Sequence, residues 1–338
     1  MHSKETSFVM ENMDILCCPN CGGQFNHNDI DLNCLDCQKI YKAIDGIPML
    51  YWQNEWDDSK DDVTEKIRLF YEKTPFPDYD DFDNVGTLIE KARQGVFARL
   101  LDEQIPSKSH IIECGCGTGQ LTNFLSIANR TVIGTDICFN SLRLAQQFKN
   151  RNNLKGAHFY QMNLFRPCFK KESFDLVISN GVLHHTSDPF LGFKTISMLV
   201  RPKGYIIIGL YHKYGRIITD IRRIINNATK DKFKFFDRRA VDESISAAKG
   251  TAWFLDQYKN PHESKHTVGE VLHWLEETGF TFIKSIPKTV PFEGIHEAES
   301  LFTPEKLGNL LERLIVNIEM ILSGSREGGF FIIIAKKI

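Results

Sequence analysis

The sequence predicts an α/β protein with a parallel sheet and helices on both faces of that sheet. Strand-like and helix-like segments alternate between residues 110 and 211, and such alternation is typical of a parallel sheet covered on both sides. A glycine-rich turn follows the first of these strands, and four cysteines near the N-terminus are spaced in two pairs. These observations predict a ligand-binding sheet preceded by a small metal-binding unit.

The alternating region accounts for five strands and three helices. The strands are expected at 110–114, 131–136, 157–161, 174–179 and 203–210, and the helices at 120–128, 140–152 and 189–200. Outside this region we expect a helix at 86–104, a helix at 267–279 that opens with a capping box, and two more strands at 280–286 and 328–335.

The glycine-rich turn occupies residues 111–119, with the sequence Ile-Ile-Glu-Cys-Gly-Cys-Gly-Thr-Gly. Glycine allows positive φ angles and lets a ligand approach the main chain. The helix after the turn offers free N–H groups and the positive end of its dipole to a carboxylate or a phosphate. Asp136 ends the next expected strand, where an acidic residue can hold the hydroxyl pair of a ribose. The segment therefore predicts a nucleotide-like ligand.

The spacing Glu-x-Gly-x-Gly-x-Gly, which begins at Glu113, differs from the dinucleotide fingerprint Gly-x-Gly-x-x-Gly. It resembles motif I of the class I S-adenosylmethionine-dependent methyltransferases, and the type 11-like members of that family resemble residues 107–211 in motif order. Phe174–His185 is similar to the family's fourth strand and the Val-Leu-His-His loop after it. Leu199–Tyr205 is similar to the turn before strand five.

This resemblance implies a Rossmann-like, seven-stranded methyltransferase sheet whose seventh strand lies antiparallel between strands five and six. It implies S-adenosyl-L-methionine as cofactor, with the ribose at Asp136 and the adenine near Asn163, where the family usually has Asp. Glu113 has a structural alternative, which is to hydrogen bond the glycine turn. The expected cofactor-binding residues are Glu113, Gly115, Cys116, Gly117, Gly119, Asp136, Ile137, Asn163, Leu164 and Asn180.

Two histidines follow the fourth strand and are candidates for acid–base work. An oxygen acceptor usually needs a base, whereas an amine needs only a free lone pair. His184 is the predicted catalytic residue, and His185 stands next to it. The alternative is that these rings pack beside the adenosine or cap a helix.

The cysteine pairs predict a structural zinc site. Cys18 and Cys21 form one C-x₂-C pair, and Cys34 and Cys37 form a second pair after twelve intervening residues. Four thiolates complete a tetrahedral zinc site, and such a closed site has no catalytic position. A redox pair or unliganded thiols are the alternatives, and the adjacent Cys17 could be mistaken for Cys18.

Three regions are expected: a zinc ribbon at 1–52, a linker with N-terminal helices at 53–106, and a methyltransferase domain at 107–338. The ribbon, with its Gly-Ile-Pro-Met-Leu ending, looks like the small zinc-ribbon protein that activates RNA- and protein-modifying methyltransferases. Here it would be fused to the catalytic domain.

A basic, amphipathic insertion is expected at about 212–266, between strand five and the helix at 267. It could meet phosphate groups, or it could be a solvated helix face with an apolar side on the core. The residues expected to line the acceptor site are Tyr211, Arg216, Trp253 and Tyr258. The segment from Phe76 to Tyr79 is the alternative candidate for the entrance to the acceptor site.

Composition and net charge limit the functions that this chain can have. The chain has 338 residues, 42% hydrophobic residues and a net charge of −2, so the whole molecule offers no electrostatic case for nucleic acid. No apolar run reaches the ~20 residues of a membrane span, so we expect a cytoplasmic protein without a membrane partner. Three functions remain: methylation of an O or N atom of a small metabolite or natural product, methylation of RNA, or non-catalytic cofactor binding.

Overall fold

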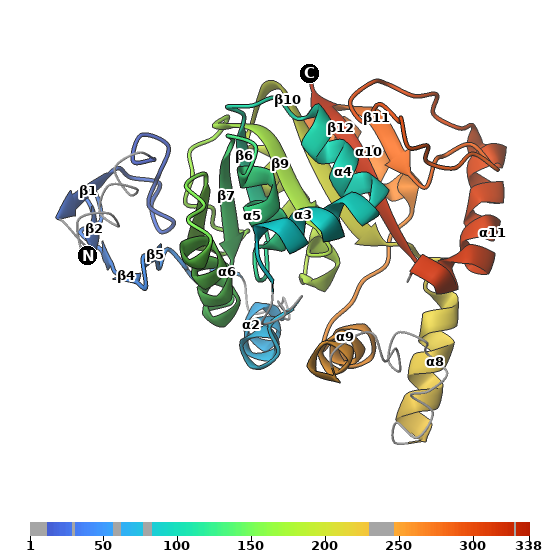
Figure 1. Cartoon of the computed structure of the whole chain (residues 1–338), viewed down its shortest axis with the longest axis horizontal. Helices are drawn as coiled ribbons and strands as arrows, with labels where there is room; N and C mark the ends of the chain where they lie inside the picture. Colours follow the sequence, from blue (N-terminus) through green and yellow to red (C-terminus); the bar gives the residue numbers. More distant parts are fainter. Residues whose placement is uncertain (1–11, 29–30, 57–61, 77–82, 230–246, 328) are drawn as a thin grey trace.

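The computed structural model describes residues 12–28, 31–56, 62–76, 83–229, 247–327 and 329–338, and of 27–28, 247–249 and 323–327 only the main chain. Its centre is a seven-stranded sheet in the order β11-β12-β10-β9-β6-β7-β8 (Figure 1). The strands are β6 (His110–Cys114), β7 (Thr131–Asp136), β8 (Ala157–Gln161), β9 (Phe174–Asn180), β10 (Val200–Tyr211), β11 (Phe280–Ile286) and β12 (Phe330–Lys337).

The order and directions of the strands confirm the predicted fold class. Strands β6, β7, β8, β9 and β10 are parallel to one another, and β12 lies antiparallel between β10 and β11. The carboxyl ends of parallel strands lie at the same edge of a sheet. The chain continues from β6 to β7 and β8 on one side and places β9 and β10 on the other, and such a change of direction leaves a crevice at the carboxyl ends beside β6. The residues that follow β6, β7, β8 and β9 therefore meet at one place.

Helices cover both faces of this sheet, because alternate side chains of each strand point to opposite sides. Ile112 joins one hydrophobic cluster and Ile111 joins the other. The first cluster contains side chains of α7 (Pro189–Ser197) and α10 (Val268–Thr278). The second contains side chains of α3 (Val85–Gln94), α4 (Val96–Gln104), α5 (Gln120–Ser126) and α6 (Phe139–Arg151).

The predicted helix at 86–104 is wrong as a single element. Gly95 has extended backbone angles, ends α3 and begins α4. Glycine is a poor helix former, so a break there costs little. In contrast, α10 begins and ends as predicted, since Thr267 and Glu270 form the capping box and Gly279 is a left-handed C-cap.

The N-terminal ribbon consists of a three-stranded sheet and a short hairpin. The strands are β1 (Phe25–Asn28), β2 (Asp31–Cys34), β3 (Ile40–Tyr41), β4 (Ala43–Ile44) and β5 (Ile47–Pro48). Met49 forms a parallel bridge with Gln161 on the edge strand β8. Tyr41 and Leu50 share a hydrophobic cluster with Tyr160. The ribbon therefore covers an edge strand and shares its core with the main sheet.

Four further helices lie around the carboxyl edge of the sheet and at the far end of the molecule. They are α2 (Thr64–Lys73), α8 (Ile217–Ala228), α9 (Ala247–Lys259) and α11 (Leu310–Glu327) (Figure 1). Among the described residues, every helix is too short or too polar to cross a bilayer.

Candidate active site

A cavity of about 440 Å³ lies at the carboxyl edge of the sheet. One side, here called the motif side, consists of residues that follow β6, β7, β8 and β9. The other, here called the cap side, consists of residues from α2, α9, the 3₁₀ turn η2 (Leu183–His185) and the end of β10. The motif-side residues are Glu113, Gly115, Cys116, Gly117, Asp136, Ile137, Met162, Asn163, Leu164, Asn180, Gly181 and Val182.

The glycine turn passes directly under the loop that follows β9. A Cβ atom on Gly115 would lie 2.3 Å from Cγ2 of Val182, and the residue has φ +82°, so only glycine fits there. Gly119 is the exception among the predicted cofactor-binding residues. It begins α5, where a Cβ atom would meet Ala145 and Phe159 at 2.7 Å, and it does not line the cavity.

Asp136 links the turn to the next helix. Its carboxylate accepts hydrogen bonds from Gly117 N at 2.9 Å and Cys138 N at 2.8 Å. Burial raises the pKa of Asp136, and these N–H donors oppose that rise. Each oxygen keeps a further lone pair, so Asp136 can hold the turn in place and still accept from two hydroxyl groups in the cavity.

Glu113 is buried under the turn. Its carboxylate accepts from the Thr122 hydroxyl at 2.5 Å, in agreement with a structural use of this side chain. Burial raises the pKa of Glu113 to about 7. The carboxyl group therefore titrates near neutral pH as long as no cation lies beside it.

Asn163 has protein partners on both ends of its amide. Its nitrogen donates to Trp52 O at 2.9 Å and to Asn54 Oδ1 at 2.7 Å, and its oxygen accepts from Phe165 N at 3.1 Å. Asn163 thus ties the segment after the ribbon to the cavity wall. One lone pair of the amide oxygen is left for a ligand, so an adenine contact there stays a prediction.

The two adjacent histidines have different surroundings. His184 is fully buried, stacks on Tyr211 with ring centroids 4.1 Å apart, and does not line the cavity. Within the described part of the chain, neither ring nitrogen of His184 has a hydrogen-bond partner. Burial lowers the pKa of His184 well below its ordinary value. This position does not agree with the predicted catalytic role of His184, because its ring is buried away from the cavity.

His185 lines the cavity instead. Its Nδ1 lies 2.8 Å from the carbonyl oxygen of His262, and a carbonyl can only accept, so Nδ1 carries the proton. Burial lowers the pKa of His185, which keeps the ring neutral. The neutral ring then has its acceptor lone pair on Nε2, as a general base requires.

A hydrogen-bonded network closes the cap side. The Asp256 carboxylate accepts from the Tyr71 hydroxyl at 2.7 Å and from Gln257 Nε2 at 3.0 Å. Gln257 Nε2 also donates to the Tyr211 hydroxyl at 2.7 Å. Glu72, next to Tyr71, accepts from the first backbone N–H groups of α6. Helix α2 is thereby fixed across the cavity, opposite α9.

Only Tyr211 of the four predicted acceptor-site residues lines the cavity. Arg216 is fully buried and pairs with Glu263, Nη2 to Oε2, at 2.7 Å. Tyr258 stacks on Phe254 at 5.1 Å, and Trp253 lies 6.1 Å from Tyr258. The prediction is corrected for Arg216, Trp253 and Tyr258, because their partners are within the protein.

Sequence reasoning missed the contribution of α2, although a signal was present. Thr64, Ile67 and Tyr71 recur at i, i+3 and i+7, which places them on one helical face, and all three line the cavity. Phe76, part of the alternative predicted entrance, lines it as well, whereas 77–79 fall outside the described residues. Asp256 and Gln257 line the cavity too, and their partners Tyr71 and Tyr211 are distant in sequence.

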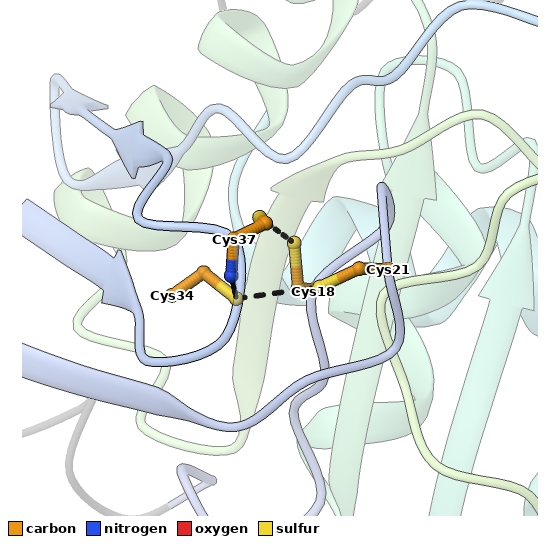
Figure 2. Close-up of side chains that lie close together, drawn as sticks. All are labelled: Cys18, Cys21, Cys34 and Cys37. Atoms are coloured by element: carbon orange, nitrogen blue, oxygen red, sulfur yellow. Dashed lines mark hydrogen bonds between the residues drawn. The ribbon is translucent and has the colours of Figure 1, made fainter.

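The four paired cysteines converge at the other end of the molecule (Figure 2). Their sulfur atoms all lie within 4.8 Å of one another, with Cys18 to Cys37 at 3.7 Å and Cys21 to Cys34 at 3.5 Å. Tetrahedral zinc with four sulfur ligands at ~2.3 Å requires sulfur atoms about 3.8 Å apart. The cluster is therefore compatible with structural zinc.

Comparison with known proteins agrees with this geometry. Residues 112–208 match the family described as "Methyltransferase domain". Residues 112–208 therefore carry a methyltransferase domain. The match begins in β6 and ends in β10, so it covers the strands that supply the motif side of the cavity.

Two curated relatives illustrate how far the similarity of this chain extends. An uncharacterized protein of Synechococcus sp. is 24% identical over 52% of this chain and 48% of its own length. A ubiquinone biosynthesis O-methyltransferase of Haemophilus ducreyi is 26% identical over 30% of this chain and 45% of its own length. The chain thus spans about half the length of these two relatives.

The solved structures to which the chain is similar are more distant in sequence. One is a complex of the Haloferax volcanii Trm112 methyltransferase activator with a methyltransferase, at 12% identity and a TM-score of 0.44, covering 77% of this chain and 99% of that one. Another is a sarcosine dimethylglycine methyltransferase of Galdieria sulphuraria. It has 12% identity and a TM-score of 0.45, and the match covers 81% of this chain and 98% of that one.

The motif side of the cavity fits S-adenosylmethionine, the cofactor predicted from the sequence. Asp136 offers free lone pairs for a ribose, and Ile137, Met162 and Leu164 add an apolar wall. A Cβ atom added to Gly181 would meet nothing within 4 Å, so this wall leaves open space in front of the main chain.

Proposed function

We propose that this methyltransferase methylates an oxygen or nitrogen atom of a small molecule, which binds on the cap side of the cavity. The observation that carries this proposal is the continuity of one cavity from the cofactor motifs to the neutral ring of His185. A volume of about 440 Å³ falls in the range of small-ligand sites.

The motif side would hold the cofactor through complementary polar groups. We assign the ribose to Asp136, the adenine to Asn163 and Leu164, and the amino-acid end to Glu113 and the glycine turn. When bound, the sulfonium supplies a methyl group that is already activated for transfer. The protein then has only to hold the acceptor in line and to exclude water, since orientation lowers the barrier strongly.

The cap side would hold and deprotonate the acceptor. His185 Nε2 takes the proton of a hydroxyl or ammonium group, and His262 O stabilises the protonated ring through Nδ1–H. Asp256, which Tyr71 and Gln257 orient, offers a carboxylate to a polar group of the acceptor. An acceptor without polar groups would gain nothing from this network.

RNA methylation is supported less well by these contacts. It rests on the basic insertion, but Arg216 and Arg223 both pair with Glu263 and face the protein. The non-catalytic alternative leaves the neutral His185 without a use.

The test is methyl transfer from radiolabelled S-adenosylmethionine to a cell extract separated into small-molecule and RNA fractions. We expect label in the small-molecule fraction with the wild-type protein, and none with His185→Ala. Label in RNA would favour the RNA alternative. Cofactor binding without transfer to either fraction would favour the non-catalytic one.

A further inference from the structure

The acidic and basic side chains around the cavity are distributed unevenly. Among the described residues that line it, Glu113 and Asp136 lie on the motif side and Asp256 lies on the cap side, and none is Lys or Arg. The two motif-side carboxylates are assigned to the cofactor. Within the described wall, Asp256 is therefore the carboxylate that remains for the acceptor.

The described hydrogen-bond partners of Asp256 are both neutral. Its carboxylate accepts from the Tyr71 hydroxyl at 2.7 Å and from Gln257 Nε2 at 3.0 Å, and the residue is 5% exposed. Two carboxylate oxygens offer about four acceptor sites, so Asp256 keeps accepting capacity toward the cavity that it lines. Burial of a carboxylate is costly unless a cation pairs with it. A cationic ligand in the cavity would relieve this cost.

The two nearby arginines have other partners. Arg216 and Arg223 both donate to Glu263 at 2.7 Å, and Arg216 also donates to Gln257 Oε1 at 2.6 Å. Gln257 in turn donates to Asp256, so its amide separates the Arg216 guanidinium from the Asp256 carboxylate. In the part of the chain that the structure describes, no Lys or Arg forms an ion pair with Asp256.

The rest of the wall suits an amine with an apolar body. Aromatic side chains line the same cavity, and they are Tyr71, Phe76, Phe165, Tyr211 and Phe330. Aromatic rings pack against alkyl groups and also attract cations. A phosphate or carboxylate in this cavity would meet acidic side chains without a described Lys or Arg to compensate its charge.

We propose that the methyl acceptor is a small amine whose protonated nitrogen pairs with Asp256. This inference rests on the proposed function, because it names the class of acceptor for that same cavity. The Tyr71 hydroxyl contacts Asp256, and the Tyr71 ring lies 6.3 Å from the ring of His185, so the carboxylate and the proposed base both lie beside Tyr71. Asp256 thus selects a cationic acceptor, whose methylated atom is an oxygen or a nitrogen.

The test divides the small-molecule fraction of a cell extract before the assay. Ion exchange at neutral pH separates this fraction into cationic, neutral and anionic pools, and the full-length protein receives each pool with radiolabelled S-adenosylmethionine. We expect labelled product from the cationic pool only. Transfer only to the neutral or anionic pool would overturn this inference and leave the proposed function intact. No transfer to any pool would overturn both.

Asp256→Asn tests the residue itself. The amide keeps the size of the side chain and one acceptor oxygen but lacks the charge. We expect KM for the amine labelled in the cationic pool to rise about tenfold or more, and kcat to change less. The affinity for S-adenosylhomocysteine, measured by calorimetry, should stay at the wild-type value, because Asp256 is on the cap side.

The matched control is Asp220→Asn, which removes a carboxylate of α8 that pairs with Lys265 and does not line the cavity. It should keep the wild-type KM. A wild-type KM in a stable Asp256→Asn protein would overturn the inference. So would a lower melting temperature and weaker S-adenosylhomocysteine binding without a change in KM, since Asp256 would then serve only to hold α2 against α9. If Asp256→Asn does not fold, the charge of the wild-type acceptor decides, because the pool assay does not depend on the variant.

Discussion

The two sides of the cavity differ in how their residues are brought together. The motif side comes from residues 113–182, each placed at the end of a parallel strand or in the loop after it. The cap side joins Tyr71 to Asp256 across 185 residues of sequence. The local arrangement of strand and turn determines the first side, whereas the second depends on helices docked from distant segments. Substitutions should therefore act differently on the two sides.

The largest effect is expected on the cap side, at His185. Replacing His185 with Ala should reduce kcat about 10²–10⁴-fold, because a positioned base contributes that much to proton transfer. The affinity for S-adenosylmethionine should stay unchanged, since the residues assigned to the cofactor are on the motif side and His185 is on the cap side. Initial rates with the acceptor found in the extract, together with calorimetry, measure both quantities.

The pH profile is the control for this assignment. A lowered pKa keeps His185 neutral at and below its ordinary value of 6.5, so the wild-type rate should stay level as pH falls past that value and decrease only at lower pH. His185→Asn keeps a donor for His262 O but has no base, and it should be as slow as the Ala variant. Full activity of either variant would contradict the role of His185.

Substitution of Arg216 distinguishes a structural role of this residue from a role in acceptor binding. Arg216→Ala should lower the free energy of unfolding by about 3 kcal/mol, because it removes one partner of the buried Glu263 and leaves only Arg223. The control Arg201→Ala breaks a pair with Asp175 in which the arginine is 57% exposed, and it should cost about 0–1 kcal/mol. Denaturant unfolding measures both. A stable but inactive Arg216→Ala protein would restore the acceptor role expected from the sequence.

Substitution of Glu113 tests whether burial on the motif side raises the pKa of its carboxyl group. Its folded-state pKa of about 7 lies above the ordinary 4.5, so the folded protein binds more protons and the cofactor-free wild type loses stability as pH rises from 4.5 to 7. The difference in free energy of unfolding between wild type and Glu113→Gln should change by about 3 kcal/mol over that interval. A difference that does not vary with pH would mean that Glu113 ionises normally.

The smallest effect is expected at Asp136. Asp136→Ala should weaken S-adenosylmethionine binding by about 1.5–3 kcal/mol, the contribution of hydrogen bonds to a charged group. Asp136→Asn retains one acceptor oxygen for the backbone and should lose less. Calorimetry against S-adenosylmethionine and a nicotinamide dinucleotide measures the change. Tight binding of the dinucleotide would contradict the choice of cofactor.

The sequence by itself determined the sheet, the cluster of four cysteines and the motif side of the cavity. Each depends on neighbours in the chain: strand–turn–helix units place Glu113 and Asp136 at strand ends, and two C-x₂-C turns bring four sulfur atoms together. Tertiary structure decided which of His184 and His185 meets the cavity, because the ring of His184 is enclosed by Tyr211. It also made Arg216 an internal ion pair with Glu263 and turned the isoleucines of α8 outward. Periodicity shows that a helix has an apolar face, but the partners across the molecule decide where that face points.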